Sequence, residues 1–209
     1  MPPIELLIAF TIAAAFLTLV PGLDTALVMR TATVENAQRA FFAGLGIAMG
    51  CIGWGAIVGA GLGALLASSE IAYTALKLCG ALYLFYLGVK LVRSPRQALD
   101  DAPVLTKESS AAGWFWRGFL TNMLNPKVGV FYVSFLPQFI PADAQAFLSS
   151  ILLGSIHGAL GVVWFVALIV ATKPIAKAIR EPSVLQWLDR VTGGIFIAFG
   201  IRLLVSEQR

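Results

Sequence analysis

Charged residues are scarce in this sequence. Only 12% of its 209 residues are Asp, Glu, Lys or Arg, whereas 58% are hydrophobic and the mean hydropathy is +0.84. A soluble domain of this length needs far more polar surface to cover its core. The net charge of +4 is carried by short segments between apolar blocks. It therefore indicates membrane topology, and we expect no nucleic-acid partner.

Several signatures of catalysis are also missing. The chain has no P-loop and no metalloprotease His-Glu-x-x-His motif, and its single histidine, His157, leaves no usable Ser-His-Asp set. The two cysteines, Cys51 and Cys79, are too far apart for a Cys-x-x-Cys pair, and we interpret them as small buried hydrophobic residues. We therefore expect no enzyme, no cofactor and no metal site.

The apolar residues form blocks long enough to cross a membrane. Residues 40–69 contain no charge, and residues 144–172 contain only His157 as an ionisable group. A transmembrane helix needs about 20 such residues. We predict an all-α polytopic membrane protein with six transmembrane helices, at about 4–29, 41–66, 71–92, 115–140, 147–171 and 185–205. The first block lacks the positive start of a signal peptide, so we expect it to be a span. Five spans are the alternative, because the last block has the shortest uncharged core.

The basic residues alternate between successive loops. The longest polar segment, residues 93–113, divides the single domain (1–209) into halves of about 1–92 and 114–209. The first, third and fifth loops and their edges carry basic residues: Arg30, Arg39, Lys90, Arg93, Arg96, Lys107, Arg117, Lys173, Lys177 and Arg180. The N-terminus and the other two loops carry none, and the C-terminal end carries two, Arg202 and Arg209. The positive-inside rule therefore predicts a cytoplasmic 93–113 loop and both termini outside.

The two halves share short signals in the same order. Phe16-Leu17-Thr18 recurs as Phe119-Leu120-Thr121, and each copy precedes a helix breaker, Pro21-Gly22 or Asn125-Pro126. Apolar sequences match easily by chance. The shared order nevertheless favours two inverted three-helix repeats with breaks in matching positions, which is an architecture of secondary transporters.

The first candidate site is the break in the first span. Pro21 and Gly22 weaken the helix, and the freed carbonyls need partners in a dry medium. Asp24 follows directly. It either caps a helix near the cytoplasmic side or faces a cavity as a proton- or amine-binding carboxylate.

The second candidate site is the break in the fourth span. It combines Asn122, Asn125, Pro126 and Lys127. A lysine deep in an apolar segment is costly unless it is paired or hydrated. Lys127 either neutralises Asp24 as a structural pair or helps to line one site with it, and such a site would suit a zwitterion.

Three further residues are cavity candidates. His157 lies mid-span and is either a hydrogen-bonded structural residue or a relay, and Trp54 and Trp164 lie deep in their spans. The glycines of the second span favour close helix packing, and these small-residue surfaces leave room for a homodimer.

The same residues resemble the lysine exporter/RhtB family of amino-acid translocators along essentially the whole chain. The resemblance is carried by Pro21-Gly22 with Asp24, by Gly44-Leu45-Gly46-Ile47-Ala48-Met49-Gly50, and by Asn125-Pro126-Lys127 followed by Leu136-Pro137-Gln138-Phe139. Leu23 departs from the family's common Pro-Gly-Pro. The resemblance implies that Asp24, Asn125, Pro126 and Lys127 belong to the substrate and coupling region.

The resemblance also implies a function and a location. It predicts an inner-membrane, multi-pass secondary exporter of amino acids or their derivatives, generally driven by protons, in contact with the lipid bilayer. Two alternatives stay open from the residues: a metal-ion exporter on a similar scaffold, and a thiol–disulfide electron carrier using Cys51 and Cys79. A purely structural membrane subunit is a third.

Overall fold

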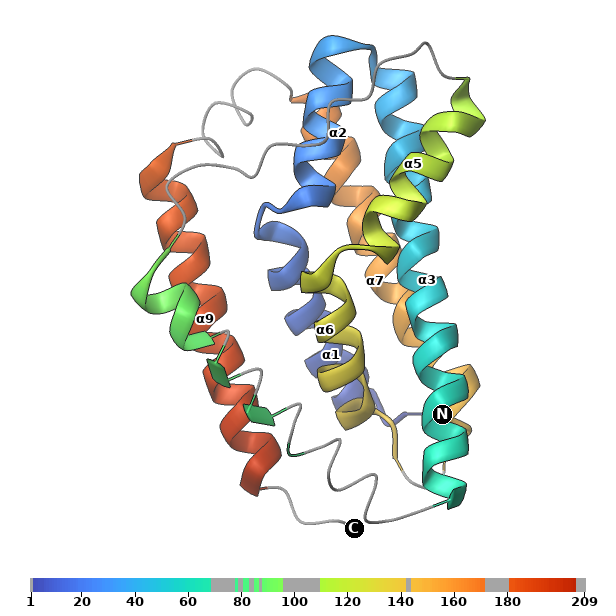
Figure 1. Ribbon diagram of the computed structural model, residues 1–209, viewed down its shortest axis with the longest axis vertical. Helices are drawn as coiled ribbons and strands as arrows, with labels where there is room; N and C mark the ends of the chain where they lie inside the picture. The colour runs from blue at the N-terminus through green and yellow to red at the C-terminus, as the bar shows by residue number, and fades with distance from the viewer. Residues whose placement is uncertain are drawn as a thin grey trace.

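The computed structural model describes residues 2–68, 78, 81–82, 85–86, 88–95, 110–141, 144–171 and 181–205, with some side chains among them left out. These residues form helices and connecting segments, with no strand among them (Figure 1). The helices are α1 (Ile4–Leu19), α2 (Leu23–Val34), α3 (Ala37–Ser68), α5 (Ala111–Met123), α6 (Pro126–Phe135), the 3-10 turn η1 (Leu136–Phe139), α7 (Ala146–Val170) and α9 (Pro182–Val205). The described residues between 78 and 93 are helical as well.

Two of these helices are long and apolar enough to cross a membrane. They are α3, over Ala37–Gly61, and α7, over Ala146–Val170, and α1 with α2 forms a third if the bent pair is one span. The predicted spans 41–66 and 147–171 agree closely with α3 and α7. An all-helical membrane protein is thus supported, whereas six spans and the inverted repeat stay predictions. The predicted span 71–92 lies largely outside the described residues.

The helices are interrupted at both predicted positions, whereas the chain is continuous. After α1, Val20 adopts an extended conformation (ψ 112°) before Pro21, and Gly22 is extended as well (φ −149°, ψ −161°). This follows from proline, which disfavours helical geometry in the residue before it. The first predicted span is therefore two helices, α1 and α2, with a bend of 52° between them.

The predicted fourth span is divided in the same way. Asn125 (ψ 110°) separates α5 from α6, and its side chain caps α6 by accepting a hydrogen bond from the Lys127 backbone N–H at 3.1 Å. Pro126 occupies the first turn of α6, where its missing N–H costs nothing. Three consecutive residues, Asn125, Pro126 and Lys127, thus determine this interruption locally.

Glycines let α3 pack tightly on both sides, as their spacing predicted. Toward α5, a side chain at Gly50 would lie 2.9 Å from the Asn122 Cβ. Toward α7, a side chain at Gly55 would lie 2.5 Å from the Ser150 carbonyl oxygen, and one at Gly154 would lie 2.7 Å from the Cys51 carbonyl oxygen. The backbones therefore approach too closely for any Cβ, and α3 forms the rigid centre between α5 and α7.

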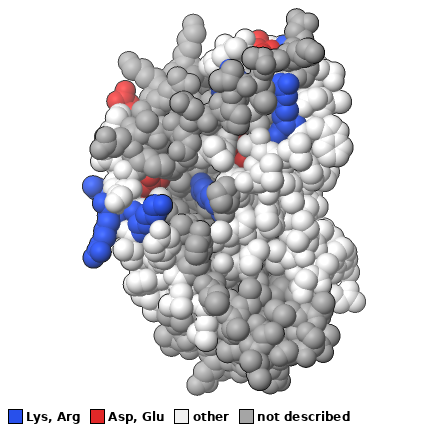
Figure 2. All heavy atoms as spheres, viewed as in Figure 1, with Lys and Arg blue, Asp and Glu red and all other residues white. Residues whose placement is uncertain are grey.

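The start of α1 and the end of α9 lie at the same end of the bundle. In Figure 1, α1 begins and α9 ends at the lower end of the bundle, whereas α5 and α9 begin at the upper end. On the face drawn in Figure 2, the described charged side chains lie in the upper part of the view and near its middle, and the described lower part is uncharged. On this face, the described charge is thus confined to the upper part and the middle of the view.

Two apolar clusters flank the middle of the bundle. The larger combines residues of α1, α3, α6, η1, α7 and α9. Four of its buried aromatic side chains pack together, with ring centroids 4.8 to 6.0 Å apart: Phe10, Phe131, Phe135 and Phe139. The smaller lies on α2, α3 and α7 around Val28, Ile47 and Phe165. We refer to the four phenylalanines as the aromatic cluster.

Candidate functional site

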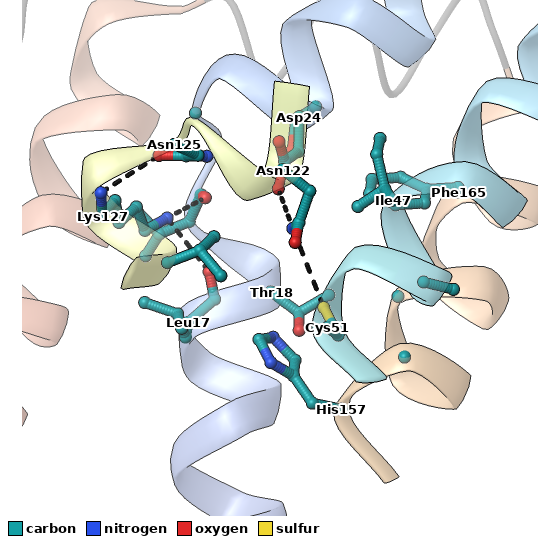
Figure 3. A pocket seen from close by; sticks show the side chains of 17 residues that line it. Leu17, Thr18, Asp24, Ile47, Cys51, Asn122, Asn125, Lys127, His157 and Phe165 are labelled. Carbon is teal, nitrogen blue, oxygen red and sulfur yellow. Dashed lines mark hydrogen bonds between the residues drawn. The ribbon is translucent and has the colours of Figure 1, made fainter. Parts of the chain in front are cut away.

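Both helix breaks line one internal pocket. Side chains from α1, α2, α3, α5, α6 and α7 converge there (Figure 3). The lining residues are Leu17, Thr18, Val20, Gly22, Asp24, Thr25, Ile47, Ala48, Cys51, Asn122, Asn125, Lys127, Val128, His157, Gly158, Gly161 and Phe165. Segments that are distant in the chain are thereby brought to one place, between the two apolar clusters.

Asp24 and Asn122 face each other across this pocket. The Asn122 amide nitrogen donates a hydrogen bond to Asp24 Oδ2 at 2.8 Å. The other oxygens, Asp24 Oδ1 and Asn122 Oδ1, are buried without a hydrogen-bond partner in the described part of the chain. Buried polar atoms normally have partners, so these two acceptors are available to a hydrogen-bond donor that enters the pocket.

Asp24 lies in the first turn of α2, which begins after the break. The N-cap of this helix is Gly22, which has no side chain to cap it, so α2 starts with uncapped backbone N–H groups beside the carboxylate. The sequence left open whether Asp24 caps a helix end or faces a cavity. The structure places it on the cavity.

Lys127 reaches from α6 to the end of α1. Its Nζ donates hydrogen bonds to the carbonyl oxygens of Val20 at 2.7 Å and Leu17 at 3.1 Å (Figure 3). These carbonyls belong to the last turn of α1, which the break leaves without helical partners. The lysine therefore joins the two broken helices.

A second hydrogen-bonded group extends the site below the carboxylate. His157 lines the pocket, and its Nδ1 lies 3.1 Å from the hydroxyl of the fully buried Tyr132. Trp54 stacks on Tyr132 with ring centroids 6.4 Å apart and donates from Nε1 to the Asn122 carbonyl at 3.3 Å. His157 is thus hydrogen-bonded, which fits both of its sequence interpretations, a structural residue or a relay.

The predicted site residues fall into two groups. Gly22, Asp24, Asn122, Asn125, Lys127 and His157 line the pocket. Pro21 and Pro126 shape the breaks without lining it, Trp54 supports Asn122 from outside, and Trp164 packs against the smaller apolar cluster instead.

Several residues in or beside this site were not assigned to it from the sequence, and three of them carry polar groups. Cys51 lines the pocket, with its Sγ 3.8 Å from the Asn122 amide nitrogen, and Tyr132 holds His157. Cys51 is buried, as expected, and is a free thiol, whereas Cys79 lies outside the described residues. Thr18 also lines the pocket and could have been found, because it ends the repeated Phe-Leu-Thr signal.

The described residues hold no group of three or more His, Cys, Asp or Glu side chains arranged to bind a metal ion. The polar groups of the pocket are one carboxylate, one ammonium, two amides, one imidazole, one thiol and the hydroxyls of Thr18 and Thr25. Such a set suits a small solute that carries its own charged groups rather than a transition metal.

Comparison with known proteins agrees with this architecture. The family model described as "LysE type translocator" matches residues 15–207. A membrane protein of Bacillus subtilis, YrhP, is 33% identical over 207 residues, which cover 96% of this chain and 99% of that protein. A homoserine/homoserine lactone efflux protein of Salmonella typhi is 29% identical over 203 residues, 96% of each chain. No solved structure matches.

These matches extend over nearly the whole chain and include both helix breaks and the pocket between them. The chain therefore belongs to the LysE family of translocators, as the residues around the two breaks had indicated.

Proposed function

We propose that this protein exports amino acids or closely related amines across the cytoplasmic membrane in exchange for protons, and that the pocket between the two helix breaks is its transport site. The observation that carries the proposal is the Asp24–Asn122 pair, which presents two unsatisfied oxygens to a pocket inside a membrane protein. Membership in a translocator family and the similarity to an efflux protein support it.

The chemistry of the efflux relative's solutes favours amine recognition. Homoserine and its lactone share an α-amino group, but only homoserine has a free carboxylate. A site common to both must therefore recognise the ammonium, and Asp24 is the acidic side chain in this pocket. The unpartnered Asn122 Oδ1 is a second acceptor beside it.

Exchange at one carboxylate gives a simple coupling mechanism. When the substrate leaves, Asp24 takes up a proton, because a bare carboxylate is costly in a dry pocket. When the proton leaves, the carboxylate again attracts an ammonium ion. A single group that holds either a proton or an amine thereby couples their opposite movements.

The pocket must open for transport. Its volume is about 40 Å³, which is room for a few water molecules at roughly 10 to 15 Å³ each. An amino acid needs a larger space, so the pocket must widen before it can hold one. Alternating access would require the two broken helices to move relative to the α3–α7 pair, whose glycine contacts are tight.

The test is efflux from cells or vesicles preloaded with labelled amino acids, including homoserine and its lactone, with and without an uncoupler. Asp24→Asn should abolish uncoupler-sensitive efflux, because an amide neither releases a proton nor balances an ammonium. Glu5→Gln is the matched control: the same chemical change in the same half, at an exposed position of α1.

We expect E5Q to transport as the wild type does, with both variants inserted in equal amounts. Full efflux by D24N would contradict the role of Asp24. If the inserted wild type exported no amino acid and no lactone, the metal-ion and structural alternatives would become the better explanations.

A further inference from the structure

Lys127 makes an unusual connection for a residue at its position. It is the second residue of α6, where the helix dipole disfavours a positive charge. Its side chain does not stay at that helix end. It crosses to α1, where Nζ contacts the carbonyl oxygens of Val20 and Leu17 at 2.7 and 3.1 Å.

These two carbonyls form a cation-binding corner. They belong to the last turn of α1, at the negative end of that helix dipole. The break at Pro21-Gly22 exposes them, and a side chain on Gly22 would lie only 3.7 Å from the Lys127 Nζ. The acidic side chain of Asp24 lines the same pocket. Carbonyls of a half-helix end near a carboxylate attract a cation strongly inside a membrane.

Transporters with broken helices often fill such corners with a metal ion. Unwound backbone carbonyls and the C-terminal ends of half-helices coordinate Na⁺ in several of these folds. Here the Lys127 ammonium occupies the corner, and it is attached to the opposite broken helix.

We propose that Lys127 is a tethered cation that takes the place of a coupling sodium ion, so that transport by this protein requires no Na⁺. The part of this inference that concerns transport rests on the proposed function. Lys127 is then a positioning residue: it keeps the break in α1 in shape and ties it to α6, while Asp24 and Asn122 contact the substrate amine.

The test replaces the cation in two ways. Lys127→Ala removes the ammonium and leaves room for an ion, whereas Lys127→Met removes the charge but fills the space with an apolar chain. In sodium-free choline medium, both variants should lose efflux by roughly ten- to hundredfold, the expected cost of losing charge-assisted hydrogen bonds. In Na⁺ medium of equal ionic strength, K127A should regain most of its efflux and K127M should not.

Heat stability of the purified proteins gives a readout that needs no substrate. K127A should unfold at a higher temperature in NaCl than in choline chloride, whereas the wild type and K127M should be indifferent to this exchange. A merely structural role for Lys127 would lower the stability of both variants without any response to Na⁺.

Two results would overturn the inference: K127A that ignores Na⁺ in both assays, or a wild-type protein whose efflux needs Na⁺. The second result does not depend on any variant folding. If the stability of K127A responds to Na⁺ but the wild type exports nothing, the proposed function fails and the tethered cation stands.

Discussion

At the residue scale, one side chain organises the pocket. Asn122 donates from its amide nitrogen to Asp24 and lies 3.8 Å from the Cys51 Sγ, while its backbone carbonyl accepts from Trp54. The amide is 1% exposed, so its orientation is set by these contacts. Because a hydrogen-bonded partner holds the carboxylate in one place, Asp24 is oriented before a substrate arrives.

Cys51 offers a built-in probe of this site. It lines the pocket but is only 4% exposed, so a small thiol reagent should label it slowly, when the pocket opens. In a Cys79→Ala background, a substrate at ten times its dissociation constant should slow this labelling by roughly tenfold, because it leaves about a tenth of the sites empty. The measurement is the labelling rate by mass spectrometry, with and without homoserine.

A thiol placed in open surroundings serves as the control for this experiment. A Cβ atom added at Gly61 would meet no atom of the described residues within 4 Å beyond its own helical turn. Gly61→Cys in a protein lacking Cys51 and Cys79 should therefore be labelled equally with and without substrate. Export that survives in a protein lacking both native cysteines would also exclude the thiol–disulfide carrier. Labelling of Cys51 that ignores a saturating substrate would place the transport site elsewhere.

At the element scale, the fold combines interrupted helices with continuous ones. The α1–α2 and α5–α6 pairs each contain a break stabilised by side chains rather than by helical hydrogen bonds. The α3–α7 pair is continuous and packs backbone against backbone at its glycines. The aromatic cluster packs between α1, α6 and η1. A transport cycle would therefore repack the broken helices against a fixed scaffold.

The scaffold's rigidity can be tested at one glycine. A methyl group on Gly46 would collide with the Phe115 carbonyl oxygen, whose backbone has no room to move within α5. Gly46→Ala should therefore destabilise the protein by about 1 to 3 kcal/mol, the usual cost of overpacking. Thermal unfolding of the purified protein in detergent measures the effect.

The matched control is Gly61→Ala, in the same helix but with open space around it. It should leave the unfolding temperature unchanged or raise it, because alanine favours a helix over glycine by up to about 1 kcal/mol. Equal unfolding temperatures for the two variants would show that α3 and α5 are not packed backbone against backbone.

At the scale of the whole molecule, charge and helix direction agree. The ends of the bundle differ in Figure 1, with α5 starting at the upper end and α7 at the lower end. The charged side chains visible in Figure 2 lie in the upper part and near the middle of the view, and the positive-inside rule predicts that the upper end is cytoplasmic. The orientation of the termini follows from this assignment and remains a prediction.

Two introduced cysteines test the orientation. Ser110 precedes α5 and Gln145 precedes α7, and both are exposed. In a cysteine-free background and in intact cells, a membrane-impermeant thiol reagent should label Gln145→Cys directly and Ser110→Cys only after the cells are permeabilised. The reverse pattern would place both termini in the cytoplasm.

The local features of this protein could be predicted from its sequence. Apolar length placed α3 and α7 within a few residues, because a span depends on composition alone. Pro21, Gly22 and Asn125-Pro126 located both breaks, because backbone geometry and a missing N–H act on adjacent residues.

Only the packing of the helices shows which side chains that are distant in the sequence come into contact. Asp24 pairs with Asn122, 98 positions away, and Lys127 binds the α1 carbonyls rather than simply facing the carboxylate across the pocket. Cys51 enters the site, whereas Trp164 does not. These outcomes depend on how the helices rotate and pack, and in apolar helices that rotation is set by glycine contacts between partners, which no single helix encodes.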